Sequence, residues 1–428
     1  MPRHSKFWKV AVLLALGILV TGHANGQGVL LPAAGAVNRG MAGATTGTAI
    51  ESIGSMIWNP ATISQLPCNE LAFGFEVLYS NYELSSTFPG VGSGSSDAEN
   101  GAAPVPTIAW VHQTKNPYLK FGVGIAGVAG FSANLRGDLS NPILAQPLAT
   151  GGTGVGGIKS DAQFFQLNPN FAVQLTDRLS IAAGPVVGLG KVTLDENPLV
   201  PANVDGTYPR GDGTRYHWGL GAQIGFHYLH NACWEFGANI KSPTWYEDFR
   251  YFSEDETGAP RTDKVDVDLP MIVSGGLGYK GFQHILLTLD VRYVGYNSAE
   301  GFGDSATYQV NGAANGLGWK DVSSISTGAQ FQLTPNLITR VGYYYSTDLF
   351  DEDATFFNIS SPLNFQHMVT MGGSYALNMN ASISAAYNYM FDFGSTGPYD
   401  LPIGTIAGSS VTTEIDVHFA VVGLNVRY

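Results

Sequence analysis

The sequence has few charges, few cysteines and, after residue 20, no long apolar run. Asp, Glu, Lys and Arg make up 13% of the chain, half of the ~25% found in an average soluble domain. The formal net charge of −13 argues against a nucleic-acid partner, which would require a basic surface. Beyond the N-terminal segment no apolar run reaches the ~18 residues that a membrane-spanning helix needs. A helical membrane protein is therefore excluded.

Signatures of catalytic chemistry are also missing. The chain contains neither a Gly-x-Ser-x-Gly nor a His-Glu-x-x-His motif, and its nine histidines are scattered. The glycine clusters are not followed by a helical pattern, so they do not fit a phosphate-binding loop. We therefore expect a protein that is not an enzyme and that needs neither a cofactor nor a metal.

The N-terminus carries a targeting segment. Basic residues precede the apolar run Val10–Val20, which is too short to cross a bilayer as a helix. Small residues follow, and cleavage after Ala24 or after Gly26 fits this pattern. We predict that residues 1–26 are a cleaved signal peptide and that the protein is exported.

The full sequence is rich in glycine, with 54 residues, and the part after the signal peptide is rich in alternating apolar and polar positions. In Ala381–Phe391 the odd-numbered positions are apolar, while serine and asparagine occupy even-numbered ones; Ile285–Tyr293 alternates in the same way. Alternation with a period of two indicates a strand. These segments exceed the ~5–6 residues of an ordinary strand and match the ~9–11 residues of a strand that crosses a bilayer at a tilt.

The connections between the expected strands alternate in length. Thr176-Asp177 and His230-Asn231 are short turns, whereas 131–161 and 195–213 are long loops. Short periplasmic turns opposite long external loops are typical of bacterial outer-membrane barrels, which have even strand numbers. We predict an all-β fold, a transmembrane antiparallel β-barrel of about fourteen strands in the outer membrane. Two of the expected strands span 232–250 and 263–280.

Ahead of the strands lies a segment of a different kind, Gly28–Pro67. Its apolar residues are small, glycines interrupt it, and it contains Asn59-Pro60-Ala61. It predicts neither a strand nor a stable helix. We expect residues 27–68 to fold as a compact hatch inside the lumen of a barrel formed by 69–428.

This segment also carries a family resemblance. The runs Asn38–Ala44, Thr48–Ile50 and Trp58–Ala61 resemble the N-terminal hatch of the FadL family of outer-membrane transporters for long-chain fatty acids and hydrocarbons. Leu167–Val173 and Trp319–Asp321 are similar to strands of that family. The resemblance implies a monomer that takes up hydrophobic compounds passively, by movement of the hatch and lateral exit through the wall. Long-chain fatty acids are the expected substrates, and alkanes or monoaromatic hydrocarbons the alternative.

Asn59, Pro60 and Ala61 are the expected gating residues of the hatch. Proline fixes its own φ and restricts the preceding residue, and an asparagine side chain can close a local turn. The motif is compatible with a static plug or with a plug that shifts. The family resemblance favours the second.

The third expected strand is unusually rich in glycine, and it contains Gly122, Gly124, Gly127 and Gly130. Glycine in a strand marks a kink, a bulge or a close approach. In the FadL family a kink in this strand opens the wall sideways, which the resemblance implies here. The alternative is that the glycines only make room for the hatch.

Charged residues expected to face the lumen are Asp290, Arg292 and Arg340. Either arginine is a candidate contact for a fatty-acid carboxylate, and the alternative is that these charges pair with one another or with the hatch. Acidic residues of the loops at 254–256 and 351–353 are candidates for cation bridges to lipopolysaccharide or are simply solvated.

Both chain ends are expected at the periplasmic face. Tyr428 ends the last strand and resembles the C-terminal signal that the barrel-insertion machinery recognises. Cys68 and Cys233 would lie near opposite sides of this rim, and a disulfide requires Cα atoms within about 7 Å; two unpaired thiols are favoured and pairing stays open. A general porin, a barrel enzyme and an adhesin are the functional alternatives.

Overall fold

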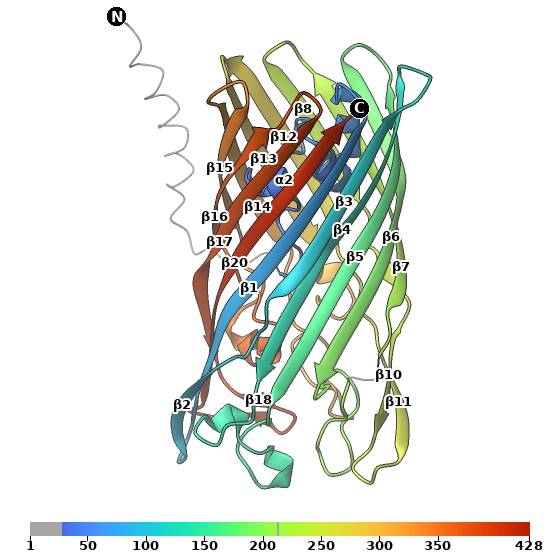
Figure 1. Cartoon of the computed structure of the whole chain (residues 1–428). Helices are drawn as coiled ribbons and strands as arrows, with labels where there is room; N and C mark the ends of the chain where they lie inside the picture. Colours follow the sequence, from blue (N-terminus) through green and yellow to red (C-terminus); the bar gives the residue numbers. More distant parts are fainter. Residues whose placement is uncertain (1–27, 212–213) are drawn as a thin grey trace, which may run out of the picture.

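The computed structural model describes residues 28–211 and 214–428, so the predicted signal peptide lies outside it. Within these residues fourteen strands close into an antiparallel barrel (Figure 1), in which each strand pairs with its neighbours along the path and β20 pairs with β1. The strands of the wall are β1 (Glu70–Phe88), β3 (Ala103–Gln113), β4 (Leu119–Leu135), β5 (Ile158–Gln174), β6 (Leu179–Asp195), β7 (His217–Leu229), β8 (Trp234–Lys241), β12 (Met271–Phe282), β13 (Ile285–Gly295), β14 (Val322–Gln332), β15 (Leu337–Ser346), β16 (His367–Ala376), β17 (Ala381–Gly397) and β20 (Ser410–Arg427).

The alternation read from the sequence sorts the side chains between the two faces of the wall. On β17, Ile383, Tyr387 and Phe391 are exposed on the outside, whereas Ser384 and Asn388 are buried on the inside. A barrel in a bilayer needs an apolar outer face and tolerates a polar interior. The predicted barrel and its polarity are confirmed. None of the helices in the described part of the chain is long and apolar enough to cross a membrane.

The long loops gather at one end of the barrel, and the short turns lie at the other end with the C-terminus (Figure 1). The loop end carries short strands and 3₁₀ helices of its own. They are β2 (Gly92–Asp97), β9 (Trp245–Tyr246), β10 (Phe249–Glu254), β11 (Pro260–Val265), β18 (Asp400–Leu401), β19 (Gly404–Thr405), η2 (Pro142–Leu144), η3 (Leu148–Thr150), η4 (Tyr296–Ser298) and η5 (Glu352–Asn358).

Two strand predictions were too long. The strand expected over 232–250 breaks after Lys241 at Ser242-Pro243, because proline has no N–H to donate to the ladder. The strand expected over 263–280 begins only at Met271. The residues before it form β11, which pairs with β10 as a separate hairpin at the loop end.

The hatch fills the lumen near the end with the short turns (Figure 1), and it consists of α2 (Ala36–Arg39), α3 (Ser52–Trp58) and η1 (Pro60–Gln65). The prediction that this segment contains no stable helix was wrong for α3. A seven-residue helix is marginal alone, but α3 is fully buried, and the Glu51 carboxylate accepts hydrogen bonds from the amides of Ile53 (2.6 Å) and Gly54 (2.5 Å). Burial and this cap stabilise a helix that would be too short to be stable on its own.

Carboxylates of the barrel wall hold the hatch in place. Glu76 accepts from the Gly35 amide (2.5 Å) and forms a fully buried ion pair with Arg39 (2.7 Å). Asp290 accepts from the Thr46 amide at 2.8 Å. Because a buried carboxylate without donors would be costly, wall and hatch satisfy each other. Cys68 and Cys233 are both free thiols.

Candidate functional site

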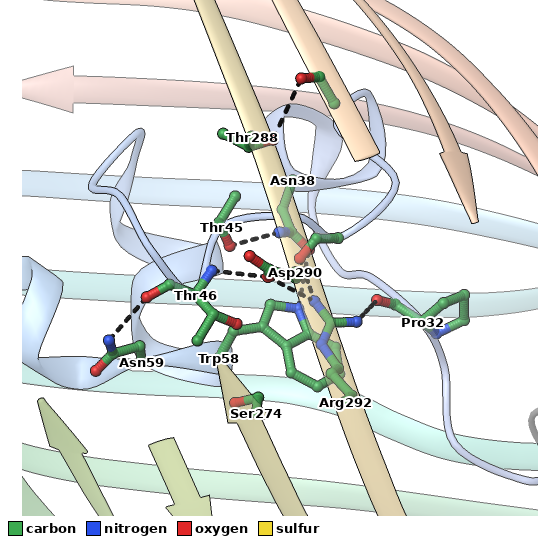
Figure 2. Close-up of polar contacts among 12 residues, drawn as sticks. Pro32, Asn38, Thr45, Thr46, Trp58, Asn59, Ser274, Thr288, Asp290 and Arg292 are labelled. Carbon is green, nitrogen blue, oxygen red and sulfur yellow. Dashed lines mark hydrogen bonds and ion pairs between the residues drawn. The ribbon is translucent and has the colours of Figure 1, made fainter. Parts of the chain in front are cut away.

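Asn59 forms the corner between α3 and η1. Its side-chain oxygen accepts from the Ala61 amide at 3.1 Å, and its amide nitrogen donates to the carbonyls of Thr46 (2.8 Å) and Phe226 (2.9 Å). The bond to Thr46 is visible in Figure 2. Pro60 occupies the first turn of η1, where its missing N–H costs nothing. The motif therefore joins two parts of the hatch to each other and to β7.

The four glycines predicted on the third strand of the wall, β4, fall into two groups. Gly122 and Gly124 lie against α3: an added Cβ would come within 2.5 Å of Met56 Sδ at Gly122 and within 2.8 Å of Met56 Cβ at Gly124. Close packing against the hatch, the alternative stated above, describes this pair. Gly127 and Gly130 flank a register shift between Gly127 and Ala129 in the pairing of β4 with β5.

The ladder between β3 and β4 stops next to this irregularity. It runs from Gln113↔Lys120 to Thr107↔Ala126, although β4 continues to Leu135. Beyond Ala126 the chain segment 29–31 takes the place of β3: Leu31 N donates to Val128 O (2.8 Å), and Gly130 N donates to Val29 O (3.0 Å). At this point the wall is closed by the start of the hatch segment and not by the neighbouring strand.

An inner cavity lies behind this closure. It contains about 430 Å³ of empty space, part of it open to solvent, and its lining includes Leu31, Trp58, Val128 and Ile272. Two polar side chains line it, Lys241 from β8 and Gln166 from β5.

Lys241 is 4% exposed, and its Nζ donates to Gln166 Oε1 at 3.2 Å. No carboxylate of the described chain lies within ion-pair distance of it. An ammonium group has three donors, so Lys241 can donate to a further, anionic partner. Sequence reasoning missed Lys241, although the alternation of β8, with Trp234, Phe236 and Ile240 outside, places it on the lumen side.

The two arginines predicted to contact a carboxylate are occupied elsewhere. Arg292 donates to Pro32 O (3.0 Å) and to Gly43 O, pairs with Asp290 (3.3 Å) and lies over the Trp58 ring at 3.6 Å (Figure 2). Arg340 donates to Gln330 (2.8 Å) and Ser374 (2.6 Å) on the wall. Neither is among the residues that line the inner cavity or the outer cavity described next. The contacts of Arg292 match the stated alternative, in which lumen charges pair with each other or with the hatch, whereas those of Arg340 are to uncharged side chains of the wall.

An outer cavity lies at the loop end. It holds about 1040 Å³ of empty space, part of it open to solvent. Its lining is mostly aliphatic and aromatic, with rings from Phe131, Phe164, Phe302, Phe356 and Phe357. Such a lining fits an apolar ligand.

The outer and inner cavities are neighbours along β5. Phe164 lines the outer cavity and Gln166 the inner one, and two residues of a strand span about 7 Å. The segment around β9 contacts both: Tyr246 packs against Phe164 with ring centroids 5.4 Å apart, and Thr244 accepts from Gln166 at 3.0 Å. The two cavities therefore lie next to each other inside the wall, with Phe164, Gln166 and the segment around β9 between them. In the described residues no group of three or more His, Cys, Asp or Glu could hold a metal.

Known structures share this architecture. The Pseudomonas putida toluene transporter TodX superposes with a TM-score of 0.68 at 16% identity, covering 93% of this chain and 99% of that one. A Pseudomonas aeruginosa FadL homologue gives 0.71 at 12% identity, with 94% and 100% covered. The Ralstonia pickettii toluene transporter TbuX gives 0.65 at 17% identity, with 93% and 99% covered. At these identities the likeness shows the fold. No curated protein matches the chain in sequence.

The sequence itself matches a family model over residues 17–428, that of the outer membrane protein transport proteins (OMPP1/FadL/TodX). The match covers the hatch and the entire wall, and the strand architecture agrees with it. The chain belongs to this family of outer-membrane channels for hydrophobic compounds.

Proposed function

We propose that this barrel takes up long-chain fatty acids or similar long hydrophobic compounds with an anionic head group. The supporting observation is Lys241, a buried cation without a carboxylate partner in the described chain, in an otherwise apolar cavity beside an interruption of the wall. A carboxylate at Lys241 would make a charge-assisted hydrogen bond. Its alkyl chain would lie on the apolar lining, where each buried CH₂ contributes about 0.8 kcal/mol.

The proposed route runs from the outer cavity to the inner one and then sideways. The ligand collects among the rings at the loop end, moves along β5 to Lys241, and leaves between β3 and β4 once residues 29–31 separate from β4. Only two backbone hydrogen bonds between segment 29–31 and β4 need to open, at a net cost of about 0.5–1.5 kcal/mol each. Asn59-Pro60-Ala61 and the glycines at 127 and 130 are the proposed moving parts.

A second candidate is a channel for neutral monoaromatic hydrocarbons. The rings that line the outer cavity favour it, and two of the similar structures are described as toluene transporters. Lys241 discriminates between the two candidates, because a neutral hydrocarbon gains nothing from a cation that offers hydrogen bonds.

The test is uptake of labelled oleate and labelled toluene by cells that lack a transporter of their own. The parent chain is compared with Lys241→Met and with Lys264→Met, a control that removes an exposed lysine from β11. Loss of one charge-assisted hydrogen bond of ~1.5–3 kcal/mol should lower oleate uptake about tenfold in Lys241→Met and leave toluene uptake unchanged. Equal oleate uptake by the parent and Lys241→Met would refute the fatty-acid assignment, as would a correctly inserted parent that restores none.

A further inference from the structure

The lining of the outer cavity contains one carboxylate and no lysine, arginine or histidine among the residues that the structure describes. The carboxylate belongs to Glu196, which directly follows the last residue of β6. In the described chain no donor is hydrogen-bonded to it and no cation lies within ion-pair distance. Its oxygens are acceptors that face an apolar cavity without a protein partner.

The charges around Glu196 are mixed. Asp195 and Asp205 are acidic neighbours, and the nearby Arg210 pairs with Asp195 at 3.6 Å instead of with Glu196. Burial, the largest cause, and the charges of Asp195 and Asp205 together raise the pKa of Glu196 to about 7, against the opposing effect of Arg210. Tyr208 faces the same cavity and donates its hydroxyl to Gly312 O at 2.6 Å; burial and the charge of Glu196 raise its pKa to about 12, so it stays neutral.

We propose that Glu196 is a specificity-determining residue, and that the outer cavity takes uncharged hydrophobic molecules with a hydrogen-bond donor, such as long-chain alcohols and phenols, ahead of anionic ones. A donor on the ligand satisfies the carboxylate, which is half-buried beside apolar walls and has no donor of the described chain. An anionic head group meets a like charge at low dielectric and is disfavoured. A long-chain acid would therefore pass the outer cavity in its uncharged, protonated form, in which its carboxyl group is itself a donor, before it reaches the cationic site at Lys241.

The discrimination against anionic ligands is expected to weaken as the pH falls. Above about pH 7 Glu196 is ionised and repels anions. As the pH falls through this value the carboxyl group becomes neutral, and the penalty on anionic ligands disappears. Neutral ligands without an ionisable group gain or lose little over the same range. The inference rests on the proposed uptake function, since it assigns selectivity to the first stage of that route.

The experiment measures equilibrium binding to the full chain in lipid nanodiscs, with binding to empty nanodiscs subtracted. The probes are radiolabelled dodecan-1-ol and dodecyl sulfonate, which share a chain length and keep one charge state from pH 5.5 to pH 8.5. The parent should bind the sulfonate about tenfold more weakly at pH 8.5 than at pH 5.5, the change expected from roughly one pKa unit of interaction. In Glu196→Gln combined with Lys241→Met, which removes the second proposed anion site, the sulfonate should bind equally at both pH values.

Two further variants assign the signal to a cavity. Leu199→Trp, which fills the outer cavity, should remove the pH-dependent part of sulfonate binding, whereas Lys241→Met should preserve it. A pH response that persists in Glu196→Gln combined with Lys241→Met overturns the inference, and so does a parent that binds both probes without regard to pH. A parent that binds neither probe contradicts the proposed function itself, so the two failures are distinguishable.

Discussion

The outer and inner cavities are neighbours along β5 and differ in size, lining and closure. The outer one is larger, is lined by aromatic rings and carries the carboxylate of Glu196; the inner one is smaller and carries the ammonium group of Lys241. Segment 29–31 closes the inner cavity toward the wall. Apolar surface is common to both and gives affinity without discrimination. The difference in charge is what lets two consecutive sites sort ligands that share a hydrocarbon chain.

The largest effect on uptake is expected from sealing the inner cavity while the outer cavity stays intact. Leu30 and Ala129 are paired in an antiparallel bridge, and such pairs have the ~4.5–5.5 Å Cα spacing that a disulfide accepts. In a Cys68→Ser, Cys233→Ser background, the pair Leu30→Cys with Ala129→Cys should reduce oleate uptake to the level of cells without the protein. Binding to the outer cavity should persist.

Reduction of this disulfide supplies the control in the same molecules. A reductant should restore uptake, because the strand pairing is then held only by its backbone hydrogen bonds. Uptake that continues while the disulfide is intact would show that ligand does not leave between β3 and β4, and the lateral route would be wrong.

A smaller effect on uptake is expected from removing the side-chain contacts of Asn59 in the hatch. Asn59→Ala leaves the buried carbonyls of Thr46 and Phe226 without these donors, at a cost of about 1–3 kcal/mol per unsatisfied group. We expect a normally inserted variant whose oleate uptake falls several-fold, because the corner that positions the hatch is lost. Hydrogen exchange of residues 46–62 should rise in parallel.

Ser64→Ala is the matched change for this variant. Ser64 bonds only locally, to Ala61 O at 2.7 Å and to the side chain of Gln65, so its removal should leave uptake and exchange near the parent values. If Asn59→Ala behaves like Ser64→Ala, the motif is a static corner and the gating role is refuted.

The sequence predicted the wall better than the site, for a physical reason. The alternation along Ala381–Phe391 is a local pattern with a period of two, and the bilayer requires its apolar side to face outward, so strands and their polarity follow from nearby residues alone. The break at Pro243 is signalled by the proline itself, and β10 and β11 pair residues close in sequence, but alternation alone does not show where a wall strand ends and a loop hairpin begins. The stable helix α3 depends on the Glu51 cap and on burial against the wall.

The charged residues illustrate the same limit. Arg292 and Lys241 both lie at lumen positions of their strands, and nothing in the local sequence separates them. In the structure Arg292 contacts Asp290, two hatch carbonyls and the Trp58 ring, whereas Lys241 has Gln166 as its one hydrogen-bond partner among the described residues. The hatch contacts Arg292 and leaves Lys241 available for a ligand. The strand pattern does not specify the path of the hatch through the lumen, so the sequence alone does not distinguish the two cations.

The smallest effect is expected from removing one aromatic ring from the lining of the outer cavity. Phe357 is half-buried in the lining of the outer cavity, and its ring centroid lies 5.0 Å from that of Tyr308. Phe357→Ala removes ring contacts worth about 0.5–1.5 kcal/mol, so binding of dodecan-1-ol to the outer cavity should weaken a few-fold. Phe252→Ala, at an exposed phenylalanine of β10 outside the cavity, should leave binding unchanged.

Because the contact of Phe357 is apolar, its removal should weaken binding of dodecyl sulfonate to the same extent and independently of pH, unlike the removal of Glu196. A pH-dependent effect of Phe357→Ala would mean that shape and charge are not separable in this cavity.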